Sequence, residues 1–592
     1  MKLTDYIASY LAQLDIKHVF VLQGGAALHL IDSIEKHPSL SAIAMQHEQS
    51  CAMAADSYAK THHVLGVTIA TSGPGATNLL TGIASSYFDS VATLHITGNV
   101  ASFRQSHKLG VRQYGFQETD IVSMAKPITK YAIQLKRPND IITVLPEAIK
   151  AALSGRPGPV LIDIPDDFQR EILDIKKIPF EAFNQSTVNH KVIQENIFNN
   201  FIVSLKQAKK PLFILGAGCH NSAERLISLA TKLKIPFLST WPLKGIANHD
   251  DELNLGNFGT HSLRGNNIVL QNCDFIISIG CRLDSKATAK LDTFAREAKI
   301  AMVDIDHNEI EKFAQLGKVI NYQFPVSVQV FLDAFSLHCE DLIEIFKNND
   351  VWLNYITDVT QEFNYIPEYN YGGVNPYLAV ELFSGAFCDD QNICVDTGTC
   401  LPLTLVYGKE KKGQQYISSY NNTPMGYALP ASIGVALAKE KEVFCIVGDG
   451  GLQMNIQELS TLNHLKLPVI IIVFNNSGHC MIKQTQDDWL DSNYFSADCN
   501  NGLPHINFSE VAKAYGIDSE KVENNEQLKL LVERLHLRMD QEGPKLIELV
   551  INPNFRYEPI IKYGNPLENM SPELAYIKQK KAMLIPSLKE NL

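Results

Sequence analysis

The sequence predicts an α/β fold built on parallel sheets, and three observations support this. Apolar runs of about five residues, rich in β-branched side chains, alternate with helix-like stretches. Glycine-rich turns follow several of these runs directly, and two polar intervals divide the 592 residues into three sections. Alternation of buried strands with helices is typical of parallel sheets, and a chain of this length is too long for one hydrophobic core.

The first section covers residues 1–175 and alternates regularly between the two patterns. The residues predict helices over 3–14, 26–36 and 47–60, and strands over 18–22, 64–70, 93–97 and 160–164. A glycine-rich turn at 71–77 follows the second of these strands. This is the order of elements expected for one parallel sheet covered by helices.

The second section covers 190–340 and the third covers 365–560. Predicted strands of the second section are 211–215, 275–279 and 300–304. Polar intervals near 171–192 and 345–375 are predicted to be linkers. A tail over 561–592 contains three lysines, at 578, 580 and 581, which are predicted to lie on a solvated helix face. No internal sequence repeat is apparent, although the first and third sections could share a fold.

Composition and charge narrow the range of possible partners and cellular locations. The formal net charge is −12 and the sequence pI is about 5.8, which argues against a nucleic-acid partner. The N-terminus is an amphipathic helix pattern with no signal peptide or membrane span. The 11 cysteines are odd in number and include no Cys-x-x-Cys pair. Free thiols in a reducing cytoplasm explain this pattern best.

The stretch Gly448-Asp449-Gly450-Gly451 predicts a site for a metal-bound diphosphate. It follows the apolar run 443–447, and a second apolar run ends at Asn475-Asn476. Parallel strands would bring Asp449 and Asn476 to one sheet edge, where a carbonyl near Gly478 could join them as oxygen ligands of Mg²⁺. A helix predicted over 455–464 would direct N–H groups at the phosphate. The alternative is that these residues form only a tight turn and a strand end.

Glu48 is the second candidate, at the start of the helix predicted over 47–60. The helix that follows it carries Ala and Met nearby rather than charges, and Cys51 stands where a zinc-protease motif would need histidine. The carboxylate could simply cap the helix. It could instead be a buried group, with a pKa raised by desolvation, that bonds a cofactor.

Several stretches together resemble the acetohydroxyacid synthase branch of the thiamine diphosphate enzymes. They are MQHEQSCAMAADSYAK, TSGPGATNLLTGIASSYFDSVATLHITGNV, GFQETDIVSMAKPITK, GRPGPVLIDIP, GDGGLQMNIQEL and NNSGHCMIKQ. The resemblance implies three doubly wound parallel-sheet domains: a pyrimidine-binding domain, a central FAD-type domain and a diphosphate-binding domain. It also implies thiamine diphosphate, Mg²⁺ and FAD as cofactors, and an active site shared between subunits of a homodimer or tetramer.

The resemblance assigns roles to individual residues. Glu48 would bond the pyrimidine ring and promote its imino tautomer. Phe116 and Gln117 would line the substrate pocket, and Gly24 and Gly25 would belong to a loop that approaches the thiazolium ring from the other subunit. Met425 would hold the cofactor in a bent shape. The remaining positions are Gly426, Gly398, Thr399, Gly448, Gly450 and Gly451 for thiamine diphosphate; Gly218, His261, Arg282 and Asp304 for FAD; and Asp449, Asn476 and Gly478 for the metal.

The expected reaction is decarboxylation of pyruvate and ligation of its two-carbon unit to a carbonyl acceptor. Departures from the family pattern leave the acceptor open. Thr485 replaces a tryptophan, Lys286 replaces an arginine that could form a bidentate fork, and Asp166 replaces a lysine. Gly398-Thr-Cys-Leu-Pro402 replaces the family's diphosphate loop. These positions concern acceptor choice and cofactor contacts rather than the decarboxylation itself.

Acetolactate formation is the first expectation, and transfer to a nucleotide-linked keto sugar or another ketone is the second, because the 562–572 tail resembles enzymes of that kind. A non-ligating decarboxylase or oxidase is less favoured. Decarboxylases use a histidine pair, and His62-His63 is the only pair in the chain; it is predicted to be a surface turn. Retention of Glu48 and Asp449 argues against a non-enzymatic thiamine-binding subunit.

Overall fold

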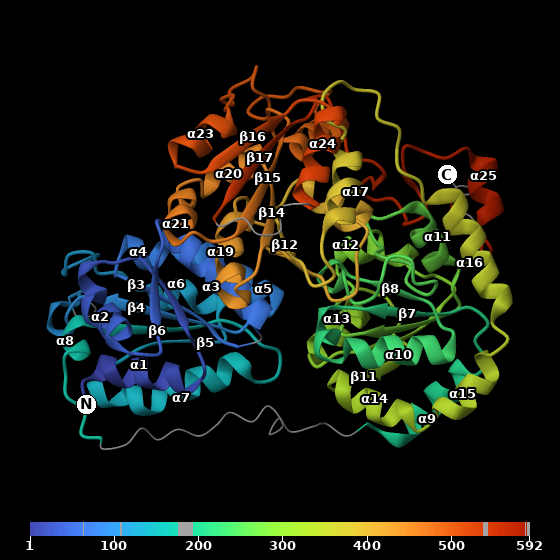
Figure 1. Ribbon diagram of the computed structural model, residues 1–592. Helices are drawn as coiled ribbons and strands as arrows, with labels where there is room; N and C mark the ends of the chain where they lie inside the picture. Colours follow the sequence, from blue (N-terminus) through green and yellow to red (C-terminus); the bar gives the residue numbers. More distant parts are fainter. Residues whose placement is uncertain (63, 107–108, 176–192, 537–542, 587, 589–592) are drawn as a thin grey trace.

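The computed structural model describes the whole chain except residues 63, 107–108, 176–192, 537–542, 587 and 589–592. It contains three α/β domains, each built around one parallel sheet (Figure 1). This confirms the predicted fold class. Among the described residues, no helix combines the length and apolar character needed to cross a membrane.

The N-terminal domain has a six-stranded sheet in the order β2-β1-β3-β4-β6-β5, with every neighbouring pair parallel. Its strands are β1 (His18–Val21), β2 (Ser41–Ala44), β3 (Gly66–Ala70), β4 (Thr93–Asn99), β5 (Tyr131–Gln134) and β6 (Val160–Pro165). Its helices are α1 (Leu3–Gln13), α2 (Leu28–Lys36), α3 (Glu48–His62), α4 (Pro74–Asn78), α5 (Leu80–Asp89), α6 (Ile121–Ala125), α7 (Ile141–Leu153) and α8 (Asp166–Gln169).

The central domain has a five-stranded parallel sheet in the order β11-β10-β9-β7-β8. Its strands are β7 (Pro211–Leu215), β8 (Phe237–Ser239), β9 (Phe275–Ile279), β10 (Lys299–Val303) and β11 (Tyr322–Phe324). Its helices are α9 (Glu195–Leu205), α10 (Ala223–Leu233), α11 (Arg264–Asn272), α12 (Ser285–Thr288), α13 (His307–Gln315), α14 (Val328–Ser336), α15 (Cys339–Phe346) and α16 (Asp350–Phe363).

The C-terminal domain has a six-stranded parallel sheet in the order β13-β12-β14-β15-β17-β16. Its strands are β12 (Asn392–Val395), β13 (Gln415–Ile417), β14 (Val443–Gly448), β15 (Val469–Asn475), β16 (Asp518–Val522) and β17 (Lys545–Val550). Its helices are α17 (Pro376–Ala386), α18 (Cys400–Pro402), α19 (Ala428–Lys439), α20 (Asp449–Met454), α21 (Glu458–Leu465), α22 (Cys480–Trp489), α23 (Phe508–Ala514) and α24 (Asn525–His536). The tail pairs β18 (Ile560–Ile561) with β19 (Met570–Ser571) and ends in α25 (Tyr576–Ala582).

The two outer domains share one topology. Numbered from its own first strand, the C-terminal sheet has the order 2-1-3-4-6-5, which is also the order of the N-terminal sheet. The sequence alone left open whether the first and third sections share a fold, and the sheet orders confirm that they do. Both sheets therefore present equivalent edges at which a ligand could bind.

Helices α3 and α19 pack against each other and join the outer domains (Figure 1). Glycine allows the close approach, because a Cβ on Gly434 would lie 2.2 Å from the Ala54 carbonyl oxygen. The Ser57 hydroxyl donates to the Ala431 carbonyl (2.8 Å). Lys60, at the far end of α3, is buried between Asp56 and Asp89, with Nζ 2.8 Å from a carboxylate oxygen of each. Lys60 Nζ also donates to the Ser418 carbonyl (2.8 Å), so this bond and the packed helix pair fix α3 relative to the C-terminal domain.

The structure differs from the sequence prediction in three places. The interval 345–375 was predicted to be a linker, but α16 occupies much of it and buries Trp352, Ile356, Val359 and Phe363. The helix predicted over 455–464 is α21 (Glu458–Leu465), but a further helix that was not predicted, α20, precedes it: α20 begins at Asp449, and the chain leaves the helical conformation at Asn455 (φ −136°). Several strands of the three sheets were not predicted, namely β2, β5, β8, β11, β12, β13, β16 and β17. Most of the first predicted linker, residues 176–192, lies outside the described part of the chain.

Candidate active site

Glu48 is the first residue of α3 and is 6% exposed. One of its carboxylate oxygens, Oε2, accepts a hydrogen bond from the side-chain amide of Asn78 (2.9 Å). The other, Oε1, lies beside Gly75 of α4, where an added Cβ would come within 2.9 Å of it. The missing side chain of Gly75 therefore leaves Oε1 accessible while Asn78 fixes the carboxylate in place.

Asp449 lies at the carboxyl end of β14, and the neighbouring parallel strand β15 ends at Asn475. In the register of the two strands Gly448 pairs with Phe474, so Asp449 and the Asn475-Asn476 pair emerge at one sheet edge, as the sequence predicts. The Asp449 carboxylate accepts the backbone N–H of Gly450 through Oδ1 (2.8 Å) and that of Gly478 through Oδ2 (3.0 Å). Burial raises the pKa of Asp449 to about 6, against the lowering effect of these hydrogen bonds.

The two asparagines that follow β15 have different surroundings. Asn475 is held on both sides, because its amide nitrogen donates to Glu548 (2.6 Å) and its amide oxygen accepts the N–H of Ser477 (3.0 Å). Ser477 adopts a left-handed conformation (φ 54°), which turns the chain at this point. Both polar atoms of the Asn475 side chain are therefore used in hydrogen bonds within the protein. Asn476 is the member of the pair whose side chain could bind a cation.

Met425 and His479 meet above Gly450. A Cβ on Gly450 would lie 2.7 Å from Nε2 of His479 and 3.0 Å from Cε of Met425. The half-buried imidazole of His479 has a pKa lowered by desolvation. Sequence reasoning identified Met425 but not His479; its position directly after Gly478 is the signal that could have drawn attention to it.

Asp396 is a second residue that the sequence analysis missed. It follows β12 at the same sheet edge and accepts the backbone N–H groups of Thr397 (2.8 Å), Gly426 (3.1 Å) and Ala428 (3.0 Å). Burial raises its pKa to about 6. Asp396 thus fixes the loop that carries Met425, and an aspartate directly after an apolar run was the signal for it.

The glycines at this edge leave open space. Gly398 after β12 has a left-handed conformation (φ 84°), and no atom of the described residues lies within 4 Å of an added Cβ at either Gly398 or Gly448. Thr399, beside Gly398, precedes α18. Gly426 also has a positive φ (85°), and a Cβ there would meet Cβ of Met454 at 2.6 Å. The backbone of neighbouring strand ends is therefore accessible, while the positive φ and close packing against Met454 require glycine at position 426.

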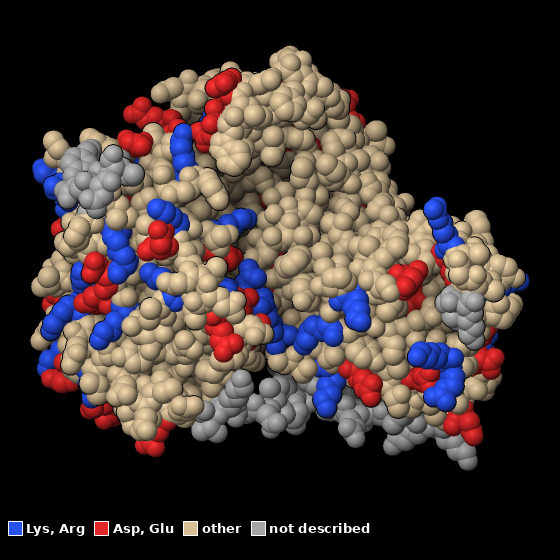
Figure 2. Space-filling view, turned by 180° about the vertical axis from the view of Figure 1, so that it is seen from behind, with Lys and Arg blue, Asp and Glu red and all other residues tan. Residues whose placement is uncertain are grey.

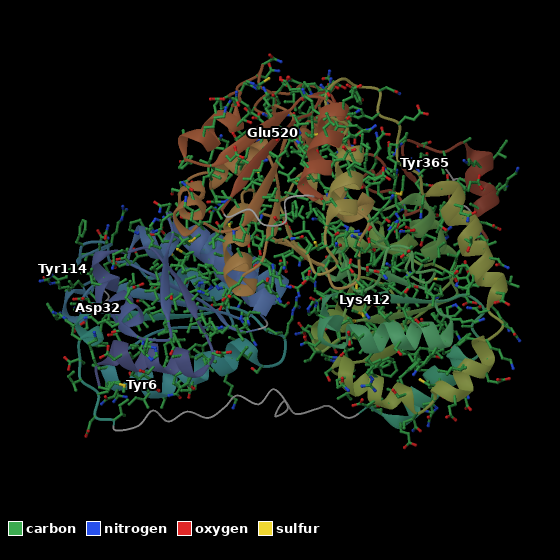
Figure 3. All side chains as sticks on the ribbon, in the orientation of Figure 1. Tyr6, Asp32, Tyr114, Tyr365, Lys412 and Glu520 are labelled. Atoms are coloured by element: carbon green, nitrogen blue, oxygen red, sulfur yellow. The ribbon has the colours of Figure 1, made fainter. Side chains whose placement is uncertain are left out.

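Phe116 and Gln117 lie in the segment between β4 and α6. Phe116 is 85% exposed, and Gln117 has a left-handed backbone (φ 61°) that packs against Gly73. Tyr114, in the same segment, lies at the outer edge of the N-terminal domain (Figure 3). Gly25 begins a short turn after β1 and has no atom within 4 Å of an added Cβ. These residues face outward rather than forming part of a closed pocket within one chain.

A cavity of about 730 Å³ lies between the central and N-terminal domains. All four residues predicted to bind FAD line it, namely Gly218, His261, Arg282 and Asp304. Burial lowers the pKa of His261 to about 4 and raises that of Asp304 to about 6. Nε2 of His261 and the hydroxyl of Thr240, which also lines the cavity, are buried without a hydrogen-bond partner among the described residues.

Cationic side chains surround this cavity. Arg156 of the N-terminal domain reaches Asp306 (3.2 Å) and Glu309 (2.8 Å) of the central domain, and Arg282 reaches Asp284 (3.2 Å). Lys286 places Nζ 5.9 Å from the ring centre of Trp241. Although the formal net charge is −12, Lys and Arg side chains gather near the middle of the rear face, where the domains meet (Figure 2). Arg156 was not among the predicted site residues.

Models of known protein families match parts of all three domains. The model for the N-terminal TPP binding domain of thiamine pyrophosphate enzymes matches residues 1–124, that for their central domain matches 199–324, and that for their C-terminal TPP binding domain matches 396–549. Thiamine pyrophosphate is another name for thiamine diphosphate. The three domains, in this order, define an enzyme of the thiamine diphosphate class.

Relatives cover nearly the whole chain. The acetolactate synthase large subunit of Cyanidium caldarium is 32% identical, over 96% of both chains. The acetolactate synthase isozyme 1 large subunit of Escherichia coli K12 is 31% identical, over 95% of this chain and 96% of its own. The large subunit of Lactococcus lactis is 32% identical, over 95% and 94%. The chain therefore belongs to the acetolactate synthase large-subunit family of thiamine diphosphate enzymes.

Proposed function

We propose that this protein decarboxylates pyruvate and ligates the two-carbon unit to a carbonyl acceptor, using thiamine diphosphate and Mg²⁺. The observation that carries the proposal is that one chain combines both halves of such a site: the accessible oxygen of Glu48 on one sheet edge, and the Asp449 turn on the equivalent edge. Its relatives are named acetolactate synthases, so a second pyruvate is the acceptor we propose first.

The residues at both edges fit the cofactor. Gly398 and Gly448 leave backbone open at adjacent strand ends, as a diphosphate requires. Asp449, Asn476 and the Gly478 carbonyl supply hard oxygen ligands, which suit Mg²⁺. When bound, thiamine diphosphate supplies the carbanion and electron-sink chemistry. Glu48 would hold the pyrimidine through Oε1, Met425 would support the bent shape, and Phe116, Gln117 and Gly25 would face the substrate.

One experiment tests the reaction and its acceptor together. Purified protein with saturating thiamine diphosphate and Mg²⁺ is incubated with pyruvate alone, and carbon dioxide and acetolactate are both measured. Equivalent amounts of both products support acetolactate synthesis. Carbon dioxide without acetolactate points to another acceptor, while absence of both contradicts the proposal.

A larger keto acceptor is the second candidate, and two side chains favour it. Thr485 is a small residue on α22 whose hydroxyl bonds back to the Met481 carbonyl (3.0 Å), so it fills little space. Lys286 directs its ammonium group toward Trp241 and cannot offer a bidentate fork to a carboxylate. A screen of 2-keto acids, ketones and a nucleotide-linked keto sugar, each added with pyruvate, separates the candidates.

The position of the His62-His63 pair does not support the alternative that the protein is a simple decarboxylase. His62 is the last residue of the 15-residue helix α3, and Glu48 is the first. A rise of 1.5 Å per residue puts their backbones about 21 Å apart. The His62 ring packs against that of Tyr58 in a tilted arrangement (ring centres 5.4 Å apart), and His63 lies outside the described residues. A histidine pair at that end of α3 is in the wrong place to assist Glu48.

We infer that the cavity between the domains binds FAD. Its volume is sufficient for a large ligand, and Nε2 of His261 and the hydroxyl of Thr240, which have no hydrogen-bond partner in the described part of the chain, offer polar contacts. Gly218 supports this assignment, because a Cβ there would lie 2.9 Å from Cα of Gly280 and would disturb the cavity wall. Visible flavin absorbance of the purified protein, or its recovery on adding FAD, is the measurement that tests the assignment.

We also propose that the active enzyme is a homodimer or tetramer located in the cytoplasm. Phe103 (71% exposed), Tyr114 (63%) and Phe116 (85%) form an apolar edge on the N-terminal domain, consistent with a site completed by a second copy. All 11 cysteines are free, as expected in a reducing compartment. Light scattering coupled to size-exclusion chromatography tests the assembly, and a monomer with full activity would contradict it.

A further inference from the structure

The turn that carries Gly478 is clamped by residues 497–499. The N–H of His479 donates to the Ala497 carbonyl (2.9 Å), and the N–H of Cys499 donates to the Ser477 carbonyl (3.2 Å). Gly478 and Asp498 therefore face each other as a non-hydrogen-bonded antiparallel pair, flanked by these two hydrogen bonds. The approach is so close that a Cβ on Gly478 would lie 2.6 Å from the Ala497 carbonyl oxygen.

This pairing decides which way the Gly478 peptide groups point. In a non-hydrogen-bonded antiparallel pair, the N–H and carbonyl of each facing residue are directed away from the partner segment. The N–H of Gly478 follows this rule and donates to Asp449 Oδ2 (3.0 Å). The Gly478 carbonyl is directed to the same side, which is the side where a cation held by Asp449 would lie.

Segment 497–499 is in turn held by a buried ion pair. Lys483 of α22 is 1% exposed and Asp498 is 6% exposed. Nζ of Lys483 donates to Asp498 Oδ2 (2.6 Å) and to the Pro553 carbonyl (2.8 Å) just beyond β17, and it lies 5.0 Å from the ring centre of Tyr494. The ammonium group thus links segment 497–499 to the chain that follows strand β17.

We propose that the Lys483–Asp498 pair is a positioning device for the cation site. It touches neither cofactor nor substrate; it keeps segment 497–499 in register and so keeps the Gly478 carbonyl aligned with Asp449. The proposal rests on the proposed magnesium and thiamine diphosphate function. Groups that orient metal ligands without touching the metal commonly affect metal affinity by about 10- to 100-fold.

The chain contains a closely matched control. Lys244 and Glu410 form another buried pair (5% and 6% exposed side chains), with Nζ 2.6 Å from Glu410 Oε2 and 2.7 Å from the Gly408 carbonyl. Lys244 also lies over a tyrosine ring, that of Tyr416, at 5.5 Å. The two pairs have the same chemistry, but Lys244 makes no contact with the turn at Gly478.

The test measures Mn²⁺ binding in the presence of saturating thiamine diphosphate, using the electron paramagnetic resonance signal of free Mn²⁺. We expect Lys483→Met and Asp498→Asn to raise the apparent Kd for Mn²⁺ by about 10- to 100-fold. Lys244→Met should lower the thermal unfolding temperature but change that Kd by less than about threefold, since it lies outside the cation's supporting shell. At saturating Mg²⁺ the KM for pyruvate should stay unchanged in all three variants.

A single substitution leaves one buried charge unpaired and can prevent folding. The double variant Lys483→Met/Asp498→Asn removes both charges and still lacks the ion pair that holds segment 497–499. It should therefore show the same loss of Mn²⁺ affinity. Gln484 still anchors α22 in this variant, through its bond to the Tyr557 carbonyl (2.8 Å). Wild-type affinity in the double variant, or an equal loss in Lys244→Met, overturns the positioning role alone. Failure of the wild-type protein to bind Mn²⁺ overturns the proposed cation site as well.

Discussion

Replacing Gly75 with alanine tests whether access to Oε1 of Glu48 matters. The new Cβ would lie 2.9 Å from Oε1 and 2.7 Å from Cγ2 of Thr71. Since non-bonded contacts relax to about 3.5 Å, the carboxylate must move by roughly 0.5 Å or more. Overpacking of this kind costs about 1–3 kcal/mol, and a misplacement of about 1 Å at a reacting group can cost about 100-fold in rate. We expect Gly75→Ala to lower kcat for carbon dioxide release by about 10- to 100-fold.

The assay follows carbon dioxide release from pyruvate at saturating thiamine diphosphate and Mg²⁺, with cofactor affinity measured separately by fluorescence quenching. Gly385→Ala is the matched control, because Gly385 also lies in a helix, α17, and no atom lies within 4 Å of its added Cβ. That variant should be fully active and slightly more stable. Wild-type kcat in Gly75→Ala would refute the reasoning that an open Oε1 is needed.

Three further changes probe the site and the fold. Glu48→Gln should retain thiamine diphosphate but slow carbon dioxide release at least about 100-fold, since proton control is lost; an undiminished rate contradicts the role. Gly450→Ala should weaken cofactor binding in a titration, because its Cβ meets the imidazole of His479 at 2.7 Å; unchanged affinity would show that the ring moves freely. Burial lowers the pKa of His95 to about 3, so stability should fall as pH drops from about 6.5 toward 3, by about 2 kcal/mol at pH 5. His95→Gln should reduce this loss between pH 7 and pH 5 in thermal unfolding, and an equal loss would contradict the assignment.

Local patterns predicted the parts of the site that depend on a strand and its end. The runs before Asp449 and Asn476 are buried strands in the structure, and parallel pairing brings both residues to one edge, as their sequence spacing suggests. The same holds for Glu48 at the start of α3. Strand length, glycine punctuation and helix starts are all set by nearby residues, so sequence alone can identify them.

Partnerships across the chain could not be predicted in this way. Asn78 is 30 residues from Glu48, and Lys483 reaches a carbonyl 70 residues away at Pro553. Such pairs depend on tertiary packing, which no local pattern records. The helix α16 was a different failure, because its four buried side chains do follow helical spacing but are separated by polar residues that resembled a linker. Helix α20 was missed because its glycines disfavour a helix, yet Gly448 is extended (φ −78°, ψ 162°) and the helix begins directly after it.

The shared topology of the outer domains explains how one scaffold supplies two kinds of chemistry. Each six-stranded sheet has the same strand order and offers an equivalent carboxyl edge. In the N-terminal domain that edge carries Glu48, with one carboxylate oxygen held by Asn78 and the other left open to a ligand. In the C-terminal domain it carries Asp449 and the Gly478 turn, an arrangement of hard oxygens suited to a cation. The fold places both sites, and a few side chains beyond the strands decide what each can bind.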